Sequence, residues 1–281
     1  MENIILVDTS FTCFYRFFAA KRWYSMAHKE EFKEIDDIEK YNWSKDEIFM
    51  EMYERMFLEA IKKIVKKKVF DNSLIIFCRD PPQEEIWRNN EMCEYKGGRQ
   101  DLTKTNNFKP VFKYTYNKLL PKLEKENDNI LVVKEDEIEA DDVIALITRY
   151  LNKVSNKNIY VVSGDEDFLQ LGDDNIYFVN YRKKQPFQLT KQEAEMALIK
   201  KIVEGDCSDN IEGIFKGKRI KGKKKMLEDK ELLMEFLNKE ENREYKIKYD
   251  RNERVIDFNY IPKKYVTSFN RKIKKLLKDL I

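Results

Sequence analysis

The chain has 281 residues, and its 54 basic and 51 acidic side chains leave a net charge of only +3. A single histidine and four cysteines without a Cys-x-x-Cys pair argue against histidine-dependent hydrolysis and against a structural zinc site. No stretch approaches ~18 consecutive apolar residues, and the start of the chain lacks a basic signal-peptide region. We therefore expect a soluble protein of a reducing, cytoplasmic compartment that makes no membrane contact.

Short apolar runs alternate with helical patterns along the chain. An unbroken apolar run is typical of a parallel strand that is buried on both faces. Such runs occupy residues 3–8, 74–77, 130–133 and 158–163. Helical spacing of apolar residues occurs in 48–64, 111–124 and 140–151. The alternation predicts parallel β-α-β units, hence an α/β fold with helices on both sides of the sheet.

The later part of the chain changes in character. Two shorter strands are expected near residues 175–180 and 185–189, and Thr190 with Glu193 predicts a capped helix over 191–203. Beyond it, residues 205–226 combine glycine and aspartate with many lysines, and the remainder reads as short helices interrupted by Pro262. We place a domain boundary here, with a catalytic domain over 1–204 and a helical region over 205–281.

One segment, residues 81–110, shows neither strand nor helix periodicity. It is polar and contains Trp87, Arg88, Tyr95 and Lys96. A segment of this length inside an α/β domain is either disordered or a functional lid.

Acidic residues follow each of the four apolar runs, and more of them occur in a Gly-Asp-x-x-Asp turn beyond residue 204. Nine carboxylates are candidates: Asp8, Asp80, Glu139, Asp141, Asp142, Asp165, Asp167, Asp206 and Asp209. Each motif alone could be a simple helix cap, but parallel strands bring their carboxyl ends to one edge of a sheet. Like charges 4 Å apart repel by roughly 4 kcal/mol at an effective dielectric of 20. The cluster is therefore expected to bind cations.

Ligand chemistry predicts which cations these are. Sites built only from oxygen select hard ions, Mg²⁺ or Mn²⁺. Two such ions about 3.5–4 Å apart can activate water and stabilise the leaving oxygen of a phosphodiester. This chemistry requires no nucleophilic side chain, in keeping with the single histidine.

The same residues resemble the 5′-nuclease superfamily of flap endonucleases, polymerase 5′-exonuclease domains and phage 5′-exonucleases. The resemblance covers most of residues 1–215 and is carried by Asp8, Asp80, Glu139-Ala140-Asp141-Asp142, Asp165-x-Asp167 and Gly205-Asp206-x-x-Asp209-Asn210-Ile211. Tyr95-Lys96 and residues 255–262 resemble, within that family, the ribonuclease H of T-even bacteriophages. The implied fold is PIN-like: a mainly parallel sheet flanked by helices, a helical arch at about 81–110, and a helix-hairpin-helix-like C-terminal region.

The resemblance implies roles for the acids and for the arch. One Mg²⁺, for which Mn²⁺ can substitute, would be held by Asp8, Asp80, Glu139, Asp141 and Asp165. A second would be held by Asp167, Asp206 and Asp209, with Asp142 nearby. Arg88, Lys96 and Arg99 would grip the scissile phosphate, and Tyr95 would stack on an unpaired base. Lys96 is the leading candidate for a cation that offsets transition-state charge.

The region after Ile211 departs from the family pattern. Relatives carry a glycine-rich hairpin that holds duplex phosphates, often with a potassium ion, whereas the glycine register here is unclear and leaves the potassium site open. A dense set of bases replaces the pattern: Lys216, Lys218, Arg219, Lys221, Lys223, Lys224 and Lys225. This basic run is expected either to follow duplex phosphates or to be a solvated loop.

The function implied by the resemblance is a monomeric, metal-dependent 5′-3′ exonuclease and flap endonuclease of DNA replication and repair. Its substrates would be DNA with a 5′ flap, nick or free 5′ end, and RNA in RNA-DNA hybrids such as primers. A clamp or a single-strand-binding protein could be a partner, and a phage origin would place it in the replication compartment of a host cell. Two alternatives stay open: a PIN-type endoribonuclease, and a non-catalytic replication scaffold.

Overall fold

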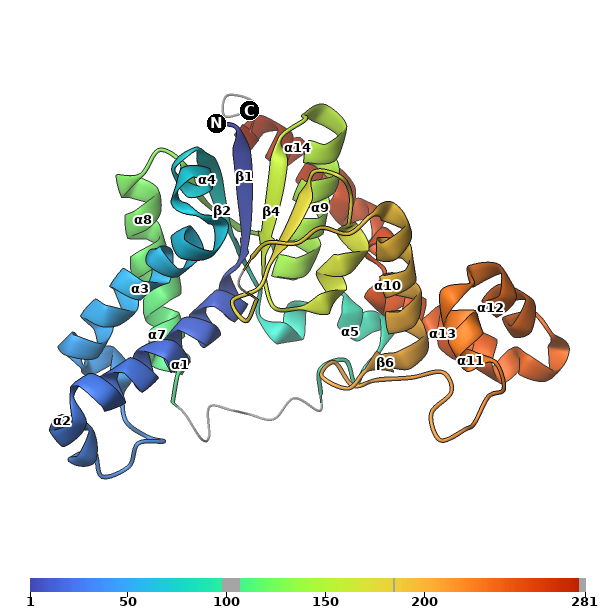
Figure 1. Ribbon diagram of the computed structural model, residues 1–281, viewed down its shortest axis with the longest axis horizontal. Coiled ribbons are helices and arrows are strands. Elements are labelled where there is room, and N and C mark those ends of the chain that lie inside the picture. The colour runs from blue at the N-terminus through green and yellow to red at the C-terminus, as the bar shows by residue number, and fades with distance from the viewer. Residues whose placement is uncertain (98–106, 184, 278–281) are drawn as a thin grey trace.

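The computed structural model describes residues 1–97, 107–183 and 185–277. Its centre is a five-stranded sheet in the order β3-β2-β1-β4-β5, and every neighbouring pair of strands is parallel (Figure 1). The strands are β1 (Asn3–Asp8), β2 (Ser73–Arg79), β3 (Ile130–Lys134), β4 (Asn158–Val162) and β5 (Ile176–Val179). The predicted α/β class with a mainly parallel sheet is confirmed.

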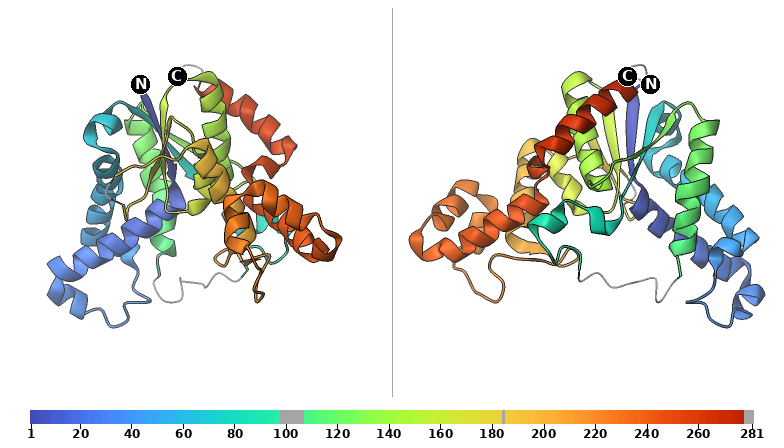
Figure 2. Two further views of the ribbon diagram at one scale, coloured as in Figure 1. Left: turned by 45° about the vertical axis from the view of Figure 1, so that its right-hand side comes forward. Right: turned by 180° about the vertical axis from the view of Figure 1, so that it is seen from behind.

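Helices cover both faces of the sheet, because alternate residues of each strand point to opposite sides. Ile5 and Val7 of β1 pack with the helices of one face: α1 (Thr9–Ala27), α3 (Glu47–Val65), α7 (Lys109–Tyr114) and α8 (Leu120–Glu126). Ile4 and Leu6 face α9 (Ala140–Val154) and α14 (Lys263–Leu277) on the other (Figure 2). Burial on both sides explains why the strands read as unbroken apolar runs.

The strand order places a reversal of direction beside β1. The chain passes from β1 to β2 and β3 on one side, and then crosses to β4 and β5 on the other. Open α/β sheets bind their ligands at such a switch point, beyond the carboxyl ends of the strands. Asp8 ends β1 and residues 163–167 follow β4, so acids occupy this position.

Some elements differ from their predicted form. The expected strand at 185–189 is a single antiparallel bridge between Phe178 and Phe187. The helix expected at 111–124 is α7, then a π-helical turn (Thr115–Leu119), then α8. The remaining short elements before β4 are α2 (Lys29–Lys33), η1 (Trp43–Lys45), α4 (Lys67–Asp71), η2 (Gln83–Glu85) and α5 (Arg88–Glu91).

The C-terminal region begins with a hairpin and continues as helices. The hairpin pairs β6 (Gly205–Asp206) with β7 (Ile211–Glu212). Around it lie η4 (Glu166–Leu171), α10 (Lys191–Glu204), α11 (Lys223–Glu228), α12 (Lys230–Leu237), η5 (Glu240–Asn242), α13 (Arg243–Ile256) and η6 (Phe258–Tyr260). Helices α11 to α13 form a lobe beside the sheet domain (Figure 1).

This lobe is joined to its surroundings by shared cores. Ile199 and Ile202 of α10 belong to the same buried cluster as Leu233 of α12 and Tyr249 of α13. The final helix, α14, leaves the lobe and packs against α9 in the core of the sheet. The helices after residue 204 therefore share their hydrophobic cores with α10 and with the sheet domain. Among the described residues, no helix combines the length and apolar character that a bilayer span requires.

Candidate metal centre

Asp8 is fixed between β1 and β4. Its Oδ1 accepts a hydrogen bond from the backbone N–H of Phe11 at 3.0 Å, so that it caps α1. Its Oδ2 accepts from the Ser163 hydroxyl at 2.9 Å. Because Ser163 directly follows β4, these bonds orient the Asp8 carboxylate at the switch point of the sheet.

Asp80 follows β2 and is held from two sides. Its Oδ1 accepts from the backbone N–H of Ala140, the first residue of α9, at 2.9 Å, and its Oδ2 accepts from the Ser10 hydroxyl at 2.5 Å. The Ser10 hydroxyl also lies 2.7 Å from that of Tyr116, in the π-helical turn. Asp80 is thereby tied to both α1 and α9.

Glu139 lies at the start of α9, where the helix dipole favours negative charge. It is buried, and Arg88, Tyr95 and Lys96 all point at its carboxylate. The Tyr95 hydroxyl also lies 3.0 Å from Oδ2 of Asp209, and the Lys96 ammonium lies 3.9 Å from the same oxygen. These contacts join the start of α9 to the hairpin.

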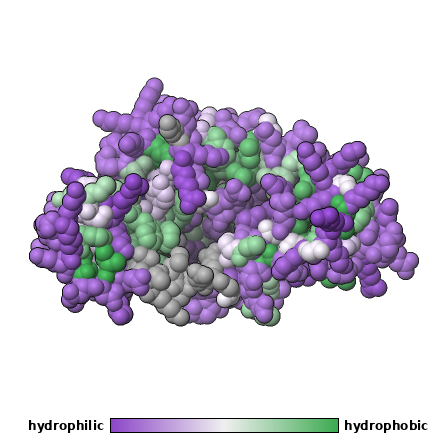
Figure 3. Space-filling model, turned by 60° about the horizontal axis from the view of Figure 1, so that its bottom comes forward, coloured by the Kyte–Doolittle hydropathy of each residue, from purple (hydrophilic) through white to green (hydrophobic). Residues whose placement is uncertain are grey.

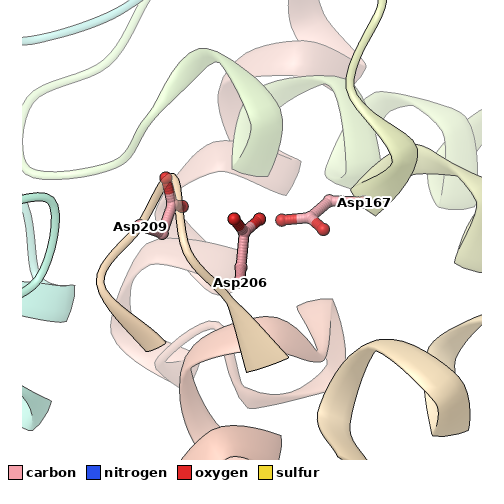
Figure 4. Close-up of side chains that lie close together, drawn as sticks. All are labelled: Asp167, Asp206 and Asp209. Atoms are coloured by element: carbon pink, nitrogen blue, oxygen red, sulfur yellow. The ribbon is translucent and has the colours of Figure 1, made fainter. Parts of the chain in front are cut away.

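The fourth and fifth segments supply Asp165, Asp167, Asp206 and Asp209. Oxygens of Asp167, Asp206 and Asp209 lie within 4.8 Å of one another, and we call these residues the three-acid group (Figure 4). Asp167 and Asp206 point toward each other, and Asp209 extends from the turn of the hairpin. The ammonium of Lys201 bridges the first two, at 2.8 Å from Asp167 and 2.5 Å from Asp206.

Burial and neighbouring acids together shift the pKa values of several carboxylates in the site. Burial, reinforced by Asp80, raises the pKa of Asp8 to about 7. The pKa of Asp141 is raised well above its ordinary value, mainly by burial and also by the charges of Asp8 and Asp165. Burial and Asp165 likewise raise the pKa of Asp167 to about 7. Carboxylates whose ionisation is opposed by burial and by neighbouring acids are ready to bind cations.

Lys201 and Asp206 show the complementary effect. Although burial opposes its charge, Lys201 has a raised pKa because Asp167 and Asp206 surround it. The pKa of Asp206 is lowered, against the effect of burial, by hydrogen bonds from Lys201 and Ser208. The ammonium group of Lys201 thus occupies part of the space between Asp167 and Asp206.

The structure brings eight of the nine predicted acids into this one region, and we call them the acidic group: Asp8, Asp80, Glu139, Asp141, Asp165, Asp167, Asp206 and Asp209. The ninth, Asp142, is placed differently. It is fully buried, and its oxygens accept from the Trp87 indole at 2.9 Å and from two nitrogens of Arg88 at 2.8 and 2.7 Å. Asp142 therefore compensates Arg88 in the interior and has no free face for a metal ion.

The described part of the predicted arch also differs from expectation. Arg88 is 2% exposed and donates to Asp142, to Glu139 and to the carbonyl oxygen of Val255. Tyr95 is 6% exposed, so that its ring is covered by protein. Neither side chain can reach a phosphate or a base in this arrangement, because their contacts with the acids hold them inward. Arg99 lies outside the described residues.

Lys96 has a left-handed backbone with φ 57°, and its N–H donates to the carbonyl oxygen of Asp209 at 3.0 Å. This bond and the pairing with Glu139 place the ammonium among the acids. The basic run lies elsewhere, in the loop after β7 and the start of α11, and its side chains are exposed except for half-buried Lys223.

Lys201 was missed in the sequence. It lies in the last turn of α10, five positions before Asp206, among other lysines that line the exposed side of the helix. The signal that could have singled it out is its position about one helical turn before the Gly-Asp-x-x-Asp turn. A charged residue at the end of a helix that leads into an acidic turn is close to those acids.

The chemistry of the donor set fits divalent cations. The acidic group offers carboxylate oxygens alone, as hard cations prefer, and burial together with neighbouring acids raises the pKa values of Asp8 and Asp167. The surface at this end of the molecule is mostly hydrophilic and has a hollow near its middle (Figure 3). Ions and polar ligands therefore meet little apolar surface on approaching it.

Comparison with known proteins assigns the family. Residues 3–201 match the family described as the 5′-3′ exonuclease, N-terminal resolvase-like domain. A 5′-3′ exonuclease of Mycoplasmopsis pulmonis is 32% identical over 183 residues, which are 61% of this chain and 56% of the relative. One from Buchnera aphidicola is 28% identical over 167 residues, 57% of this chain and 54% of the relative. The chain spans about half the length of these curated relatives.

Solved structures agree on the fold. The 5′-exonuclease of bacteriophage T5 with bound zinc superposes with a TM-score of 0.60 at 14% identity. The match covers 97% of this chain and 98% of the T5 chain. The T5 flap endonuclease in complex with DNA and metal ions has a TM-score of 0.61 at 15% identity, and covers 98% and 99%. At such identities the likeness concerns the fold alone. Because the family match spans well over half of its length, the chain belongs to the family of the 5′-3′ exonuclease N-terminal resolvase-like domain.

Proposed function

We propose that this chain is a metal-dependent, structure-specific 5′ nuclease that removes nucleotides from 5′ ends and cuts 5′ flaps. The observation that carries the proposal is the acidic group, in which carboxylates from five segments of the chain meet at the switch point of the sheet. Membership of the 5′-3′ exonuclease family supports the same reaction.

The residues divide into two ligand sets. Asp8, Asp80, Glu139, Asp141 and Asp165 would hold one Mg²⁺, and the three-acid group would hold another, with Mn²⁺ as a substitute. When bound, such ions neutralise phosphate charge and supply an activated water for in-line attack. The protein positions the acids through Ser163, Ser10 and the backbone N–H groups of Phe11 and Ala140.

Lys96 is proposed as the catalytic cation. Its ammonium lies beside Glu139 and Asp209, and the Asp209 carbonyl oxygen fixes its backbone. Lys96 is 8% exposed, so contact with the scissile phosphate requires its ion pair with Glu139 to open. Once released, its positive charge can stabilise charge that develops in the transition state. Lys201 has a matching position beside Asp167 and Asp206, and we propose that it orients these two acids.

The proposed substrates are DNA with a 5′ flap, nick or free 5′ end, and RNA paired to DNA. The basic run supports duplex binding, because six of its seven side chains are exposed in the loop after β7 and at the start of α11. Each phosphate that such a surface neutralises releases counterions and adds affinity. The same proposal describes a monomeric enzyme of replication and repair that works with a clamp or single-strand-binding protein. It also includes the finer resemblance to T-even phage ribonuclease H.

The alternatives are weaker on particular observations. The hairpin that carries Asp206 and Asp209 is part of the acidic group, whereas a PIN-type endoribonuclease is expected to lack it. A non-catalytic scaffold would not need eight carboxylates gathered at the switch point of the sheet. Comparing cleavage of a 5′-labelled DNA flap with cleavage of single-stranded RNA separates the proposal from the first alternative.

The central test removes one acid from each ligand set. Asp141→Asn and Asp167→Asn are each expected to lower Mg²⁺-dependent cleavage of end-labelled flap, nicked and RNA-primed duplexes by more than about 100-fold, since a direct ligand contributes more than an outer partner. Affinity for the uncleaved duplex should persist. The exposed Asp128→Asn, at the far end of the sheet, is the matched control. Full activity of both active-site variants would refute the assignment.

A further inference from the structure

Gln170 uses its entire side-chain amide to join two distant parts of the chain. Its Nε2 donates to the carbonyl oxygen of Asp167 at 2.9 Å and to that of Ile256 at 3.0 Å. Its Oε1 accepts from the N–H of Phe258 at 2.9 Å. Gln170 lies in η4, one turn after Asp167, whereas Ile256 and Phe258 lie on either side of the junction between α13 and η6. We call residues 255–258 the junction.

Other side chains dock the same junction. The Nη1 of Arg149 donates to the carbonyl oxygen of Phe258 at 2.8 Å, and the Phe258 ring packs on Phe168 at 6.1 Å between centroids. The Nε of Arg88 donates to the carbonyl oxygen of Val255 at 2.8 Å. The junction is thus a fixed point against the sheet domain.

The same helix, α13, is attached to the hairpin one turn earlier. Asn252 is fully buried, and its Nδ2 donates to the carbonyl oxygens of Ile202 and Glu212, both at 2.9 Å. Arg251 donates to the same Glu212 oxygen at 3.3 Å. Glu212 ends β7, so these bonds position the hairpin that carries Asp206 and Asp209.

The three-acid group is therefore assembled from two segments that are both anchored on α13. Gln170 anchors the turn with Asp167, and Asn252 anchors the hairpin. Like charges within this group favour separation of the two segments, and the anchors oppose it. We propose that Gln170 and Asn252 are positioning residues, through which α13 sets the distance between Asp167 and the hairpin acids and hence the metal affinity of that site.

The inference rests on the proposed function, because it takes the three-acid group as a metal site. It gives α13 a second role, besides that of a helix in the proposed duplex-binding lobe. Partners that orient metal ligands typically change metal affinity or activity by 10–100-fold when they are removed. The effect should be largest for the ion that the three-acid group holds, because Gln170 bonds directly to the backbone of Asp167. Asp165 of the other ligand set is linked to it only through the Asp167 N–H, at 2.9 Å.

The experiment measures metal binding without catalysis. Mn²⁺ is titrated calorimetrically into the metal-free full chain, as wild type, Gln170→Met and Gln170→Glu. Methionine keeps the length of the side chain and removes all three hydrogen bonds, whereas glutamate keeps only the acceptor for Phe258. The matched control is Gln188→Met, which removes an exposed glutamine whose Nε2 donates to the carbonyl oxygen of Asp174.

We expect both Gln170 variants to bind one Mn²⁺ about 10–100-fold more weakly and to change the affinity for the other by a smaller factor, while Gln188→Met matches wild type in both. On flap DNA, kcat should fall and KM should change little, since the duplex-binding surface is intact. Unaltered affinity for both ions in a folded Gln170 variant would overturn the inference, and thermal melts identify which variants are folded. If wild type itself binds no Mn²⁺, the proposed function fails, and this inference fails with it.

Discussion

Single carboxylates in and beside the acidic group differ in what compensates their charge. Asp142 forms an ion pair with Arg88 inside the protein, with 2.7 Å between Nη2 and Oδ1, and its charge is neutralised there. Asp206 forms an ion pair with Lys201 and accepts a hydrogen bond from the Ser208 hydroxyl. Asp8 accepts hydrogen bonds from Ser163 and Phe11, and it faces the carboxylates of Asp80 and Asp165. A buried acid that faces other acids, as Asp8 does, has a raised pKa.

A pH dependence of stability follows from these raised values. The pKa values of Asp8 and Asp167 are raised in the folded protein to about 7. Their contribution to stability is therefore complete below the ordinary value of 3.8 and is lost as pH rises through 7. Divalent cations bind the ionised form, so Mg²⁺ should raise the thermal midpoint more at pH 8 than at pH 5.

Thermal unfolding in EDTA and in Mg²⁺ across this pH range measures the effect. Asp8→Asn cannot ionise, and in EDTA at pH 8 it should unfold a few degrees above wild type, because about 1 kcal/mol corresponds to roughly 2–4 °C in a protein of this size. A wild type that gains equally from Mg²⁺ at both pH values would contradict the prediction.

Among the elements, the hairpin depends most on one backbone conformation. Gly205 ends α10 with φ 74° and ψ −171°, a combination almost confined to glycine. A Cβ at this position would lie 2.4 Å from the carbonyl oxygen of Ile211 and 2.5 Å from the N of Gly213. Both neighbours are backbone atoms of the hairpin, so neither can rotate away.

Two glycine variants of similar φ separate strain from steric conflict. Gly217 has φ 72° and open space where its Cβ would be, so Gly217→Ala should cost only about 1–2 kcal/mol of stability. Gly205→Ala should cost more and should also displace Asp206, and so weaken Mn²⁺ binding in calorimetric titrations. Equal effects of the two variants on metal binding would show that the hairpin tolerates the change.

Across the whole molecule, the charges are divided although their sum is nearly zero. The acidic group lies at the carboxyl end of the sheet, and the basic run lies in the loop and helix beyond the hairpin. A polyanion would therefore be held by the basic run while its scissile phosphate meets bound cations at the acidic group. This division supports the proposed binding of nucleic acid by a protein whose net charge is only +3.

The salt dependence of binding tests this division. Replacing Lys218, Arg219 and Lys221 by alanine should weaken duplex binding in EDTA and reduce the slope of log affinity against log salt, by up to about 0.9 for each phosphate that the variant no longer neutralises. The control replaces Lys63, Lys67 and Lys68, which are exposed near the amino end of β2. A slope that falls as much in the control as in the test variant would show that the basic run has no special part.

Much of the architecture was predictable because its causes are local. Strands buried on both faces need unbroken apolar runs, and the cap formed by Thr190 and Glu193 uses residues three positions apart, so both could be read from the chain. The acids after β1, β2 and β4 were predictable for the same reason, since a parallel sheet aligns the ends of its strands.

The partners of those acids depended on the tertiary structure. Arg88 pairs with Asp142 across 54 positions, and Ser163 donates to Asp8 across 155. No local pattern marks such a contact, because burial and a nearby opposite charge decide which side chain faces the interior. The sequence by itself thus determined the sheet and the acidic residues at its edge. Only the packing of helices around that sheet decided which acids remain available to cations and which are neutralised within the protein.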